Sequence, residues 1–387
     1  MTPAAGAAPA RAAASPAAAS SSAPCVFGGG NPVDCRSSDP EATKVISANG
    51  DCSTTYFDID IDWGDRTPVQ KISTHGPAAD QKLPIGSHDY AKRGTYDINV
   101  TGTVVSGPCT FTGSSYTFTL AKVTSKLRLA ALGDSYSSGE GAGDYYAGTN
   151  GPTGCHRSQH AWALQLSKYV GNHDVSMPSQ EYFLACSGAV SSALKDSFKG
   201  EEAQVDALQH LLPKPTLVTL TMGGNDLGFA DVVADCAKAF LHRTNCIKDG
   251  TIAGVEAKLP AEEKILASDY IDVHLADPDA TLLIVGYPRI FEDTSTCLTI
   301  TPVEEKALNV LTGDVDDMIA RAAAADNFSF VPDLGAFKDH EMCTKDPWLY
   351  EIGVLRNLND DQQQAHPNTL GQEAIAKAVA NFINTHL

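Results

Sequence analysis

The sequence is poor in basic residues. It has 28 lysines and arginines against 47 aspartates and glutamates, a formal net charge of −19 and a sequence pI near 4.8. Nucleic-acid binding needs clustered positive charge, so this balance argues against nucleic acid as a partner. It also argues against simple electrostatic adsorption to anionic lipid, while neutral or apolar substrates stay open.

Long apolar runs are missing as well. No stretch approaches the roughly 18 to 20 apolar residues that span a bilayer. Residues 1–24 are half alanine, 12 of 24, and lack the basic n-region and leucine-rich h-region of an intact signal peptide. We predict a disordered leader over 1–24, and we base the expectation of a secreted protein on the cysteines instead.

The sequence also lacks the short motifs of several enzyme classes. It has no G-x-S-x-G elbow, no H-E-x-x-H zinc motif and no phosphate-binding P-loop. We therefore predict no metal and no cofactor. His156 and His160, which flank a predicted helix start, are assigned to packing or capping.

Ten cysteines are present, and none forms a C-x-x-C pair. This excludes a zinc ribbon or a thioredoxin-like site and favours structural disulfides formed in an oxidising compartment. Sequence does not fix connectivity, and pairing of neighbours is the simplest hypothesis. The hypothetical pairs are 25–35, 52–109, 155–186, 236–246 and 297–343.

Short alternating segments predict an all-β domain over 25–123. Residues 56–63, 95–104 and 115–120 alternate apolar and polar side chains between Gly, Pro and Asp turns, which is typical of a small antiparallel sandwich. Asp58, Asp60 and Asp62 fall on one face of the first strand. They could ligate calcium, but a solvated sheet face is the favoured interpretation.

Two short motifs in this domain resemble the PKD-like (polycystic kidney disease) module. Trp63-Gly64-Asp65 follows the first predicted strand, and His88-Asp89-Tyr90 precedes Gly94-Thr95-Tyr96. The sequence departs from the module at Arg66, where the family often has glycine. The resemblance implies a structural or adhesive role.

From residue 126 to 387 the pattern becomes α/β. Apolar strands are predicted at 127–132, 216–222, 281–286 and, more weakly, 328–331. Helix-like stretches lie at 159–170, 201–212, 255–276, 303–325 and 370–386. Buried strands that alternate with helices predict a three-layer, doubly wound, mostly parallel sheet. Ligands bind such sheets beyond the carboxyl ends of the strands.

Four short segments lie at predicted strand ends or helix starts. They are Gly133-Asp134-Ser135-Tyr136-Ser137, Ala185-Cys186-Ser187-Gly188-Ala189, Met222-Gly223-Gly224-Asn225-Asp226 and His366-Pro367-Asn368. A serine, a glycine N–H, an asparagine amide and a histidine are the groups that nucleophilic catalysis with an oxyanion hole requires. Each segment alone is weak, but the four together point to an active site.

Residues 126–387 resemble the SGNH (GDSL-type) hydrolases, particularly secreted actinobacterial esterases and lipases; Gly286-Tyr287-Pro288 also fits that group. The resemblance implies a flavodoxin-like sheet. It makes Ser135 the nucleophile and His366 the general base, and it places Gly188, Asn225 and the Ser135 N–H in the oxyanion hole.

One position departs from the family pattern. The aspartate three residues before the histidine is replaced by Gln363. We predict a Ser–His dyad in which the main-chain carbonyl of Gln363 orients His366. The Gln363 side chain, or Asp360 or Asp361, are lesser alternatives.

The predicted activity is carboxylic-ester hydrolysis through an acyl-enzyme by a monomer acting on a small-molecule or lipid ester, with transient contact to a lipid interface. Alternatives are a phospholipase, an acyltransferase or a carbohydrate O-deacetylase. A rival from another class is a non-catalytic adhesion protein with a degenerate hydrolase scaffold. Leu227 and Phe229 could belong to an apolar substrate groove or simply begin a packed helix.

Overall fold

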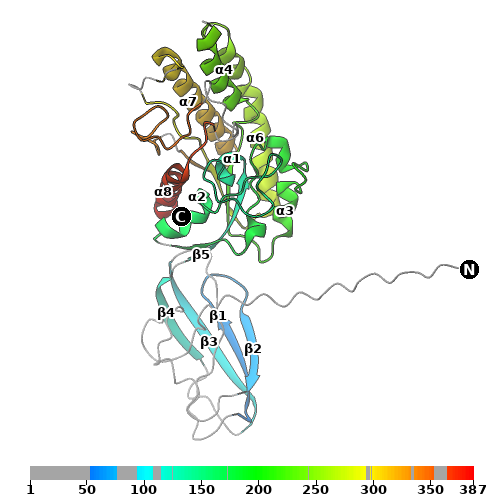
Figure 1. Cartoon of the computed structure of the whole chain (residues 1–387). Coiled ribbons are helices and arrows are strands. Elements are labelled where there is room, and N and C mark those ends of the chain that lie inside the picture. The colour runs from blue at the N-terminus through cyan, green and yellow to red at the C-terminus, as the bar shows by residue number, and fades with distance from the viewer. Residues whose placement is uncertain are drawn as a thin grey trace, which may run out of the picture. The chain divides into compact units, whose positions relative to one another are not determined.

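The structure is a computed structural model, and the chain divides into two compact units (Figure 1). One unit comprises Met1–Tyr90 and Gly94–Val123, the other Ala91–Arg93 and Thr124–Leu387. The structure describes residues 53–75, 94–107, 115–123, 125–171, 173–242, 244–292, 297, 299–332, 335–352 and 364–387.

The smaller unit contains a four-stranded antiparallel sheet in the order β2-β1-β3-β4. The strands are β1 (Tyr56–Asp62), β2 (Gln70–His75), β3 (Gly94–Ser106) and β4 (Ser115–Val123). Phe57, Ile59 and Ile61 alternate into its core, together with Ile98 and Val100 of β3. This period of two confirms the predicted antiparallel strands, whereas a second sheet, which a sandwich requires, is not found in the described part of the unit.

The three aspartates of β1 have partners within the protein. Asp58 accepts a hydrogen bond from Ser73 (2.5 Å), and Asp60 pairs with Lys71 (2.8 Å) on the neighbouring strand. Asp62 accepts from the main-chain N–H of Gly64 at 2.9 Å. These contacts support the polar-face interpretation over calcium ligation.

The larger unit is built on a five-stranded parallel sheet in the order β6-β5-β7-β8-β9. Its strands are β5 (Ser125–Gly133), β6 (His173–Ser176), β7 (Leu217–Thr221), β8 (Thr281–Val285) and β9 (Ser329–Val331). The apolar runs of β5, β7 and β8 are buried on both faces, so the predicted α/β class is confirmed. The edge strand β6 was not predicted, because its four residues include His173 and Asp174.

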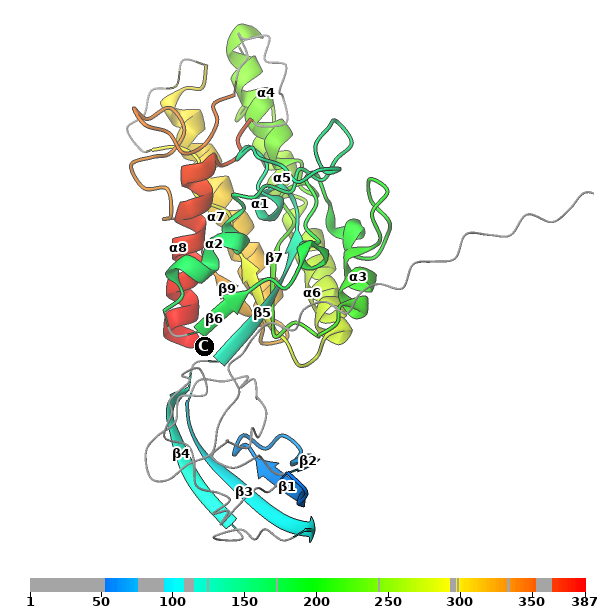
Figure 2. The same cartoon turned by 60° about the horizontal axis from the view of Figure 1, so that its bottom comes forward.

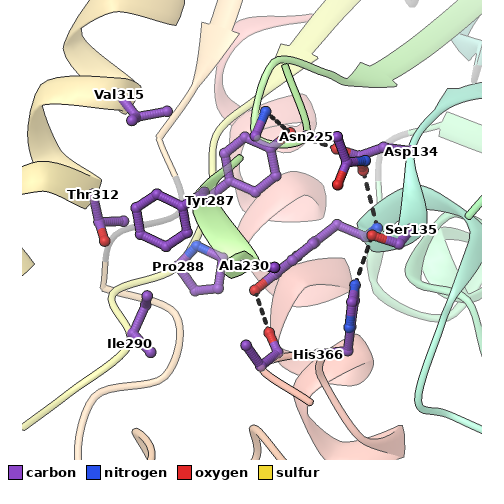
Figure 3. Close-up of a pocket in the computed structure, with 14 residues that line it drawn as sticks. Asp134, Ser135, Asn225, Ala230, Tyr287, Pro288, Ile290, Thr312, Val315 and His366 are labelled. Carbon is purple, nitrogen blue, oxygen red and sulfur yellow. Dashed lines mark hydrogen bonds between the residues drawn. The ribbon is translucent and has the colours of Figure 1, made fainter. Parts of the chain in front are cut away.

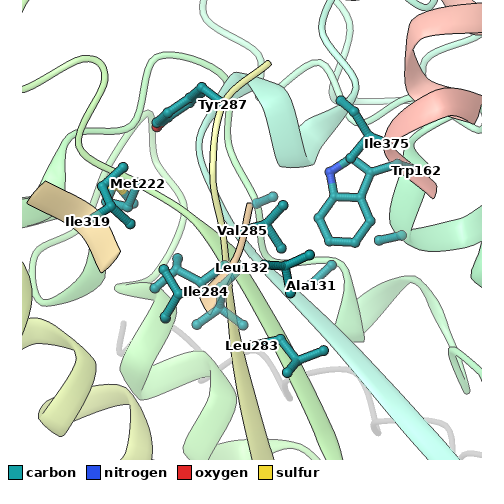
Figure 4. Close-up of a cluster of buried hydrophobic side chains, with 14 of the residues drawn as sticks. Ala131, Leu132, Trp162, Met222, Leu283, Ile284, Val285, Tyr287, Ile319 and Ile375 are labelled. Atoms are coloured by element: carbon teal, nitrogen blue, oxygen red, sulfur yellow. The ribbon is translucent and has the colours of Figure 1, made fainter. Parts of the chain in front are cut away.

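Helices cover both faces of this sheet. They are α1 (Ser135–Ser138), α2 (Trp162–Tyr169), α3 (Gln204–His210), α4 (Phe229–His242), α5 (Thr251–Glu256), α6 (Leu259–Ala276), α7 (Pro302–Ala324) and α8 (Thr369–His386). Helix α2 packs on α8 and α6 packs on α7, as Figures 1 and 2 both show. In Figure 4, Trp162 and Ile375 lie on one side of the strands and Ile319 on the other. The arrangement is the predicted three-layer fold.

Two helices differ from the sequence prediction. The stretch 255–276 is divided into α5 and α6, and Pro260 lies in the first turn of α6, where proline is well tolerated. Helix α4 was not among the predicted helix-like stretches, although a packed helix beginning near Phe229 was one of the two alternatives for that residue. Its first residue, Phe229, follows directly on the loop after β7.

Three of the five hypothetical disulfides are confirmed: Cys155–Cys186, Cys236–Cys246 and Cys297–Cys343. The cysteines of the other two pairs lie outside the described residues. Among the described helices, none has the length and apolarity needed to cross a membrane.

The strand order places two loops together at the carboxyl edge of the sheet. In an order of this type the crevice opens between the first strand and the third, which here are β5 and β7. Ser135 follows β5, and Asn225 follows β7. The fold therefore brings two of the predicted site segments to one crevice.

Candidate active site

Ser135 lies in a sharp turn between β5 and α1. Gly133 adopts a φ of +123°, and a Cβ at this position would lie 2.5 Å from the carbonyl oxygen of Thr221. Only glycine fits that combination, which explains the residue two positions before the serine. The side chain of Asp134 caps helix α1. Ser135 is the first residue of this helix and is 4% exposed.

His366 contacts Ser135 directly (Figure 3). Its Nε2 lies 2.7 Å from Ser135 Oγ, and its Nδ1 lies 2.9 Å from the main-chain carbonyl oxygen of Gln364. A carbonyl only accepts hydrogen bonds, so Nδ1 carries the proton and Nε2 presents a lone pair to the serine hydroxyl. This is the tautomer that a general base requires.

The carbonyl that contacts the imidazole Nδ1 among the described residues is that of Gln364, the neighbour of Gln363. Gln363, Asp360 and Asp361 lie outside the described residues, so the prediction for Gln363 stays a prediction. Ala365 has a left-handed φ of 60°, and this local turn accompanies the contact from the Gln364 carbonyl to the ring.

The two predicted oxyanion segments are tied together. Asn225 Nδ2 donates to the carbonyl oxygen of Ala189 at 2.7 Å, which orients the amide. Asp226 accepts from the N–H and the hydroxyl of Ser191 at 2.7 to 3.0 Å. Gly188, the residue before Ala189, adopts a left-handed φ of 80°. Among the described residues, its N–H meets no main-chain acceptor.

Asp134 is a site residue that the sequence analysis left without a role. Its carboxylate accepts from Thr221 Oγ1 (2.6 Å), Tyr287 OH (2.5 Å) and the Tyr136 N–H (3.0 Å). Burial raises its pKa to about 6, although the hydrogen bonds from Thr221 and Tyr287 act in the opposite direction. Because Tyr287 is 153 residues away in the sequence, no local pattern could reveal the pair.

Tyr287 also supports the loop after β7. Its hydroxyl accepts from the main-chain N–H of Gly224 at 3.1 Å while it donates to Asp134. One phenol therefore joins the turn that carries Ser135 to the loop that carries Asn225. The Gly286-Tyr287-Pro288 segment had been noted as typical of the family group, which was the available signal.

A pocket opens beside Ser135 and His366, with an empty volume of about 560 Å³ that includes open solvent. Its wall away from the serine is mainly apolar (Figure 3) and is supplied by α4, the segment after β8 and α7. The wall residues are Phe229, Ala230, Tyr287, Pro288, Ile290, Thr312 and Val315. Phe229 thus lines the pocket, whereas Leu227 is a buried core residue.

The two histidines singled out near residue 160, His156 and His160, lie outside this pocket. His156 is buried and its Nδ1 lies 2.6 Å from Glu140 Oε2, while His160 pairs with Asp144 at 2.8 Å. His156 therefore has the packing role expected for it. No group of three or more potential metal ligands occurs within the described ranges.

Comparison with known proteins adds independent findings. The model of the GDSL-like Lipase/Acylhydrolase family matches residues 131–374. Lipase 1 of Streptomyces coelicolor is 32% identical over 248 residues, covering 62% of this chain and 81% of that protein. The structure of an extracellular lipase from Streptomyces rimosus matches with a TM-score of 0.54 at 26% identity, covering 66% of this chain and 99% of that one. Phospholipase A1 from Streptomyces albidoflavus NA297 matches with a TM-score of 0.54 at 30% identity, covering 66% and 98%.

Proposed function

Because the chain belongs to the GDSL-like lipase/acylhydrolase family and is therefore a hydrolase of the lipase and esterase kind, we propose that it cleaves lipid esters through an acyl-enzyme on Ser135. The 2.7 Å contact between Ser135 Oγ and His366 Nε2 carries this proposal. It requires no metal and no cofactor.

In the proposed reaction, His366 Nε2 takes the hydroxyl proton as Ser135 Oγ attacks the ester carbonyl. The negative oxygen of the tetrahedral intermediate accepts from the N–H groups of Ser135 and Gly188 and from Asn225 Nδ2. Collapse returns the proton to the leaving alcohol, and water then hydrolyses the acyl-enzyme by the same route. The carbonyl of Gln364 holds the ring and stabilises the imidazolium, in place of an aspartate.

The pocket favours an acyl chain over an acetyl group. Its wall is mostly aliphatic and aromatic, and burial of each methylene contributes about 0.8 kcal/mol. The likeness to a phospholipase A1 and to lipases supports fatty-acyl esters of glycerol or of phospholipids as substrates. A carbohydrate O-deacetylase would instead need a small, polar site.

A fluorophosphonate probe tests the nucleophile. We expect the wild-type protein to be labelled stoichiometrically and Ser135→Ala to be unlabelled, with Ser179→Ala, an exposed serine, as the matched control. His366→Ala should slow labelling by several orders of magnitude. Absence of labelling in the folded wild type, or labelling that survives Ser135→Ala, would establish the non-catalytic alternative.

A series of p-nitrophenyl esters of rising chain length, assayed beside a phospholipid panel, tests the substrate. We expect kcat/KM to rise from acetate to medium-chain esters and fatty acid to be released from the glycerol backbone. A preference for acetate together with release of acetate from acetylated sugars would replace this proposal by a deacetylase. Transfer of the acyl group to an added alcohol in preference to water would indicate an acyltransferase.

We further propose that the protein is secreted, works as a monomer and touches lipid interfaces transiently. The three disulfides of the described residues support an oxidising compartment. For the smaller unit we propose a PKD-like β-sandwich with a structural or adhesive role. Arg66 supports this, because it adopts the left-handed φ (71°) at the position where that module often has glycine.

A further inference from the structure

Glu140 lies between the nucleophile's turn and the segment Ala185–Ala189, which we call the oxyanion segment. Its main-chain N–H donates to the carbonyl oxygen of Ser135 at 3.0 Å. Its side chain, in a residue only 1% exposed, accepts from Ser187 Oγ at 2.8 Å. One residue therefore connects the main chain of the nucleophile to the neighbour of Gly188.

The Glu140 carboxylate is held by two further side chains. Tyr145 OH lies 3.1 Å from Oε1, and His156 Nδ1 lies 2.6 Å from Oε2. His156 Nε2 lies 2.7 Å from the carbonyl oxygen of Gly151 and 3.3 Å from the main-chain nitrogen of the same residue. The imidazole is thus held on both sides, and it fixes the position of the Glu140 carboxylate.

The oxyanion segment has no regular secondary structure of its own and depends on cross-links. The Cys155–Cys186 disulfide and a hydrogen bond from the Ser187 N–H to the Cys155 carbonyl (3.0 Å) attach it to the residues beside His156. Arg157 Nε adds a bond to the Ala185 carbonyl at 2.9 Å. The main-chain N–H groups of Ala185 and Cys186 also donate to the carbonyl oxygens of Ala131 and Gly133 of β5, both at 2.9 Å. Beyond these main-chain bonds, the Ser187–Glu140 bond is the side-chain contact that relates the neighbour of Gly188 to the turn of Ser135.

We propose that Glu140 is a positioning residue for the oxyanion hole. Through its hydrogen bond with the Ser187 hydroxyl, Glu140 fixes the position of the Gly188 N–H relative to Ser135. The Gly188 N–H is therefore in position before negative charge develops on the substrate oxygen. The inference rests on the proposed function, because it takes Gly188 as an oxyanion donor. Preorganised donors lose most of their effect when displaced by about 1 Å, on the order of 100-fold in rate.

The test compares Glu140→Gln, Ser187→Ala, Ser187→Thr and the double variant Glu140→Gln/Ser187→Ala. Thr385→Ala, which removes a hydroxyl bonded to the Asn381 carbonyl in the last turn of α8, is the control. For each protein, kcat and KM on a soluble ester, affinity for a trifluoromethyl ketone and the melting temperature are measured. The ketone forms a tetrahedral adduct with an oxyanion, so its affinity reports the oxyanion hole.

We expect Ser187→Ala to lower kcat by about 10-fold and Glu140→Gln by about 100-fold, with KM within about 2-fold, and ketone affinity to fall in parallel. Ser187→Thr, which keeps a hydroxyl, should recover most of the loss. The double variant should be no slower than Glu140→Gln alone, because the Ser187 hydroxyl acts through the Glu140 carboxylate and its removal costs nothing further once that carboxylate is replaced.

A lower melting temperature with kcat and ketone affinity unchanged would overturn the proposal and leave Glu140 a purely structural residue. If Glu140→Gln fails to fold, Ser187→Ala and Ser187→Thr decide the question by the same measurements. Failure of the proposed function looks different, because the wild type would then not be labelled at Ser135, whatever the variants at 140 and 187 do.

Discussion

At the scale of single residues, the Asn225 carboxamide has two separate tasks. One N–H is bound to the Ala189 carbonyl, and the other is free to reach a substrate oxygen in the proposed mechanism. We expect Asn225→Ala to lower kcat by about 100- to 1000-fold, as loss of one oxyanion donor does. The protein should remain folded, because the described residues make few contacts with this side chain besides the hydrogen bond at the Ala189 carbonyl.

Steady-state kinetics and circular dichroism check this expectation, with Asn381→Ala, an exposed amide on α8, as the control. A loss below about 5-fold in a folded Asn225→Ala protein would remove Asn225 from the oxyanion hole.

The hydrogen bond between His366 Nδ1 and the Gln364 carbonyl leads to a second prediction. The acceptor is a main-chain carbonyl, which any side chain at that position leaves in place. Gln364→Ala should therefore keep kcat/KM within about 3-fold of the wild type, and so should Gln363→Ala, whereas His366→Ala should abolish most activity. Ester hydrolysis assays of the three variants decide this. A collapse in either glutamine variant to the level of His366→Ala would show that its side chain takes part.

The sequence indicated the reacting groups of the site but not the groups that hold them. Ser135 and His366 lie in contact as predicted from short motifs beside elements whose ends are readable in the sequence. Asp134, Glu140 and Tyr287 act through buried contacts with residues far along the chain, and such pairings have no local signature. The Gln364 carbonyl that accepts from His366 Nδ1 lies in a local turn where Ala365 has a left-handed φ, which composition does not fix either.

At the scale of elements, helix α7 supplies one wall of the pocket. Thr312 and Val315 are one turn apart and both line it, whereas Val310 on the same helix is 54% exposed. We expect Val315→Phe to fill the space and to shift the preference toward shorter esters. If two methylenes of the acyl chain are excluded from the pocket, about 1.6 kcal/mol of binding free energy is lost. The kcat/KM on long-chain esters should therefore fall roughly 15-fold, while the kcat/KM on short esters changes little.

The chain-length series measured on Val315→Phe, with Val310→Phe as the matched control, tests this prediction. An equal fall on short and long esters would mean that the substitution disturbs the catalytic residues and that Val315 is no determinant of chain length.

Elements differed in how well the sequence predicted them, for physical reasons. The strands β5, β7 and β8 are continuous apolar runs because they are buried on both faces. The edge strand β6 is short and partly polar, so it produced no clear pattern. The apolar residues of α4 do recur at helical spacing, and this helix was predicted only as an alternative to a substrate groove at Leu227 and Phe229. The family resemblance implied a flavodoxin-like sheet, but no strand order was predicted, since periodicity carries no information on neighbours.

At the scale of the whole molecule, several buried carboxyls couple stability to pH. Burial raises the pKa of Asp134 to about 6 and the pKa values of Glu262 and Asp316 to about 7. The unfolded chain ionises these groups near pH 4. Between about pH 4 and 7 the folded state therefore holds protons that the unfolded state has released, so the free energy of unfolding falls as pH rises.

We expect a higher melting temperature at pH 5 than at pH 8. Glu262→Gln should weaken this dependence. From pH 5 to pH 8, the free energy of unfolding of this variant should fall less than that of the wild type, by on the order of 2 kcal/mol. Calorimetry at a series of pH values measures it, with the exposed Glu256→Gln as the control. A melting temperature that rises from pH 5 to pH 8, or an unchanged slope in Glu262→Gln, would contradict the prediction.

The wall of the pocket and the proposed catalytic residues come from different parts of the larger unit. Ser135 and Asn225 follow β5 and β7, and His366 precedes α8, whereas much of the wall belongs to α4 and α7. Selectivity for the acyl group can therefore diverge by substitutions in two helices while the reacting atoms stay where they are. For an engineer, α7 is the place to retune this hydrolase for a new ester without rebuilding its chemistry.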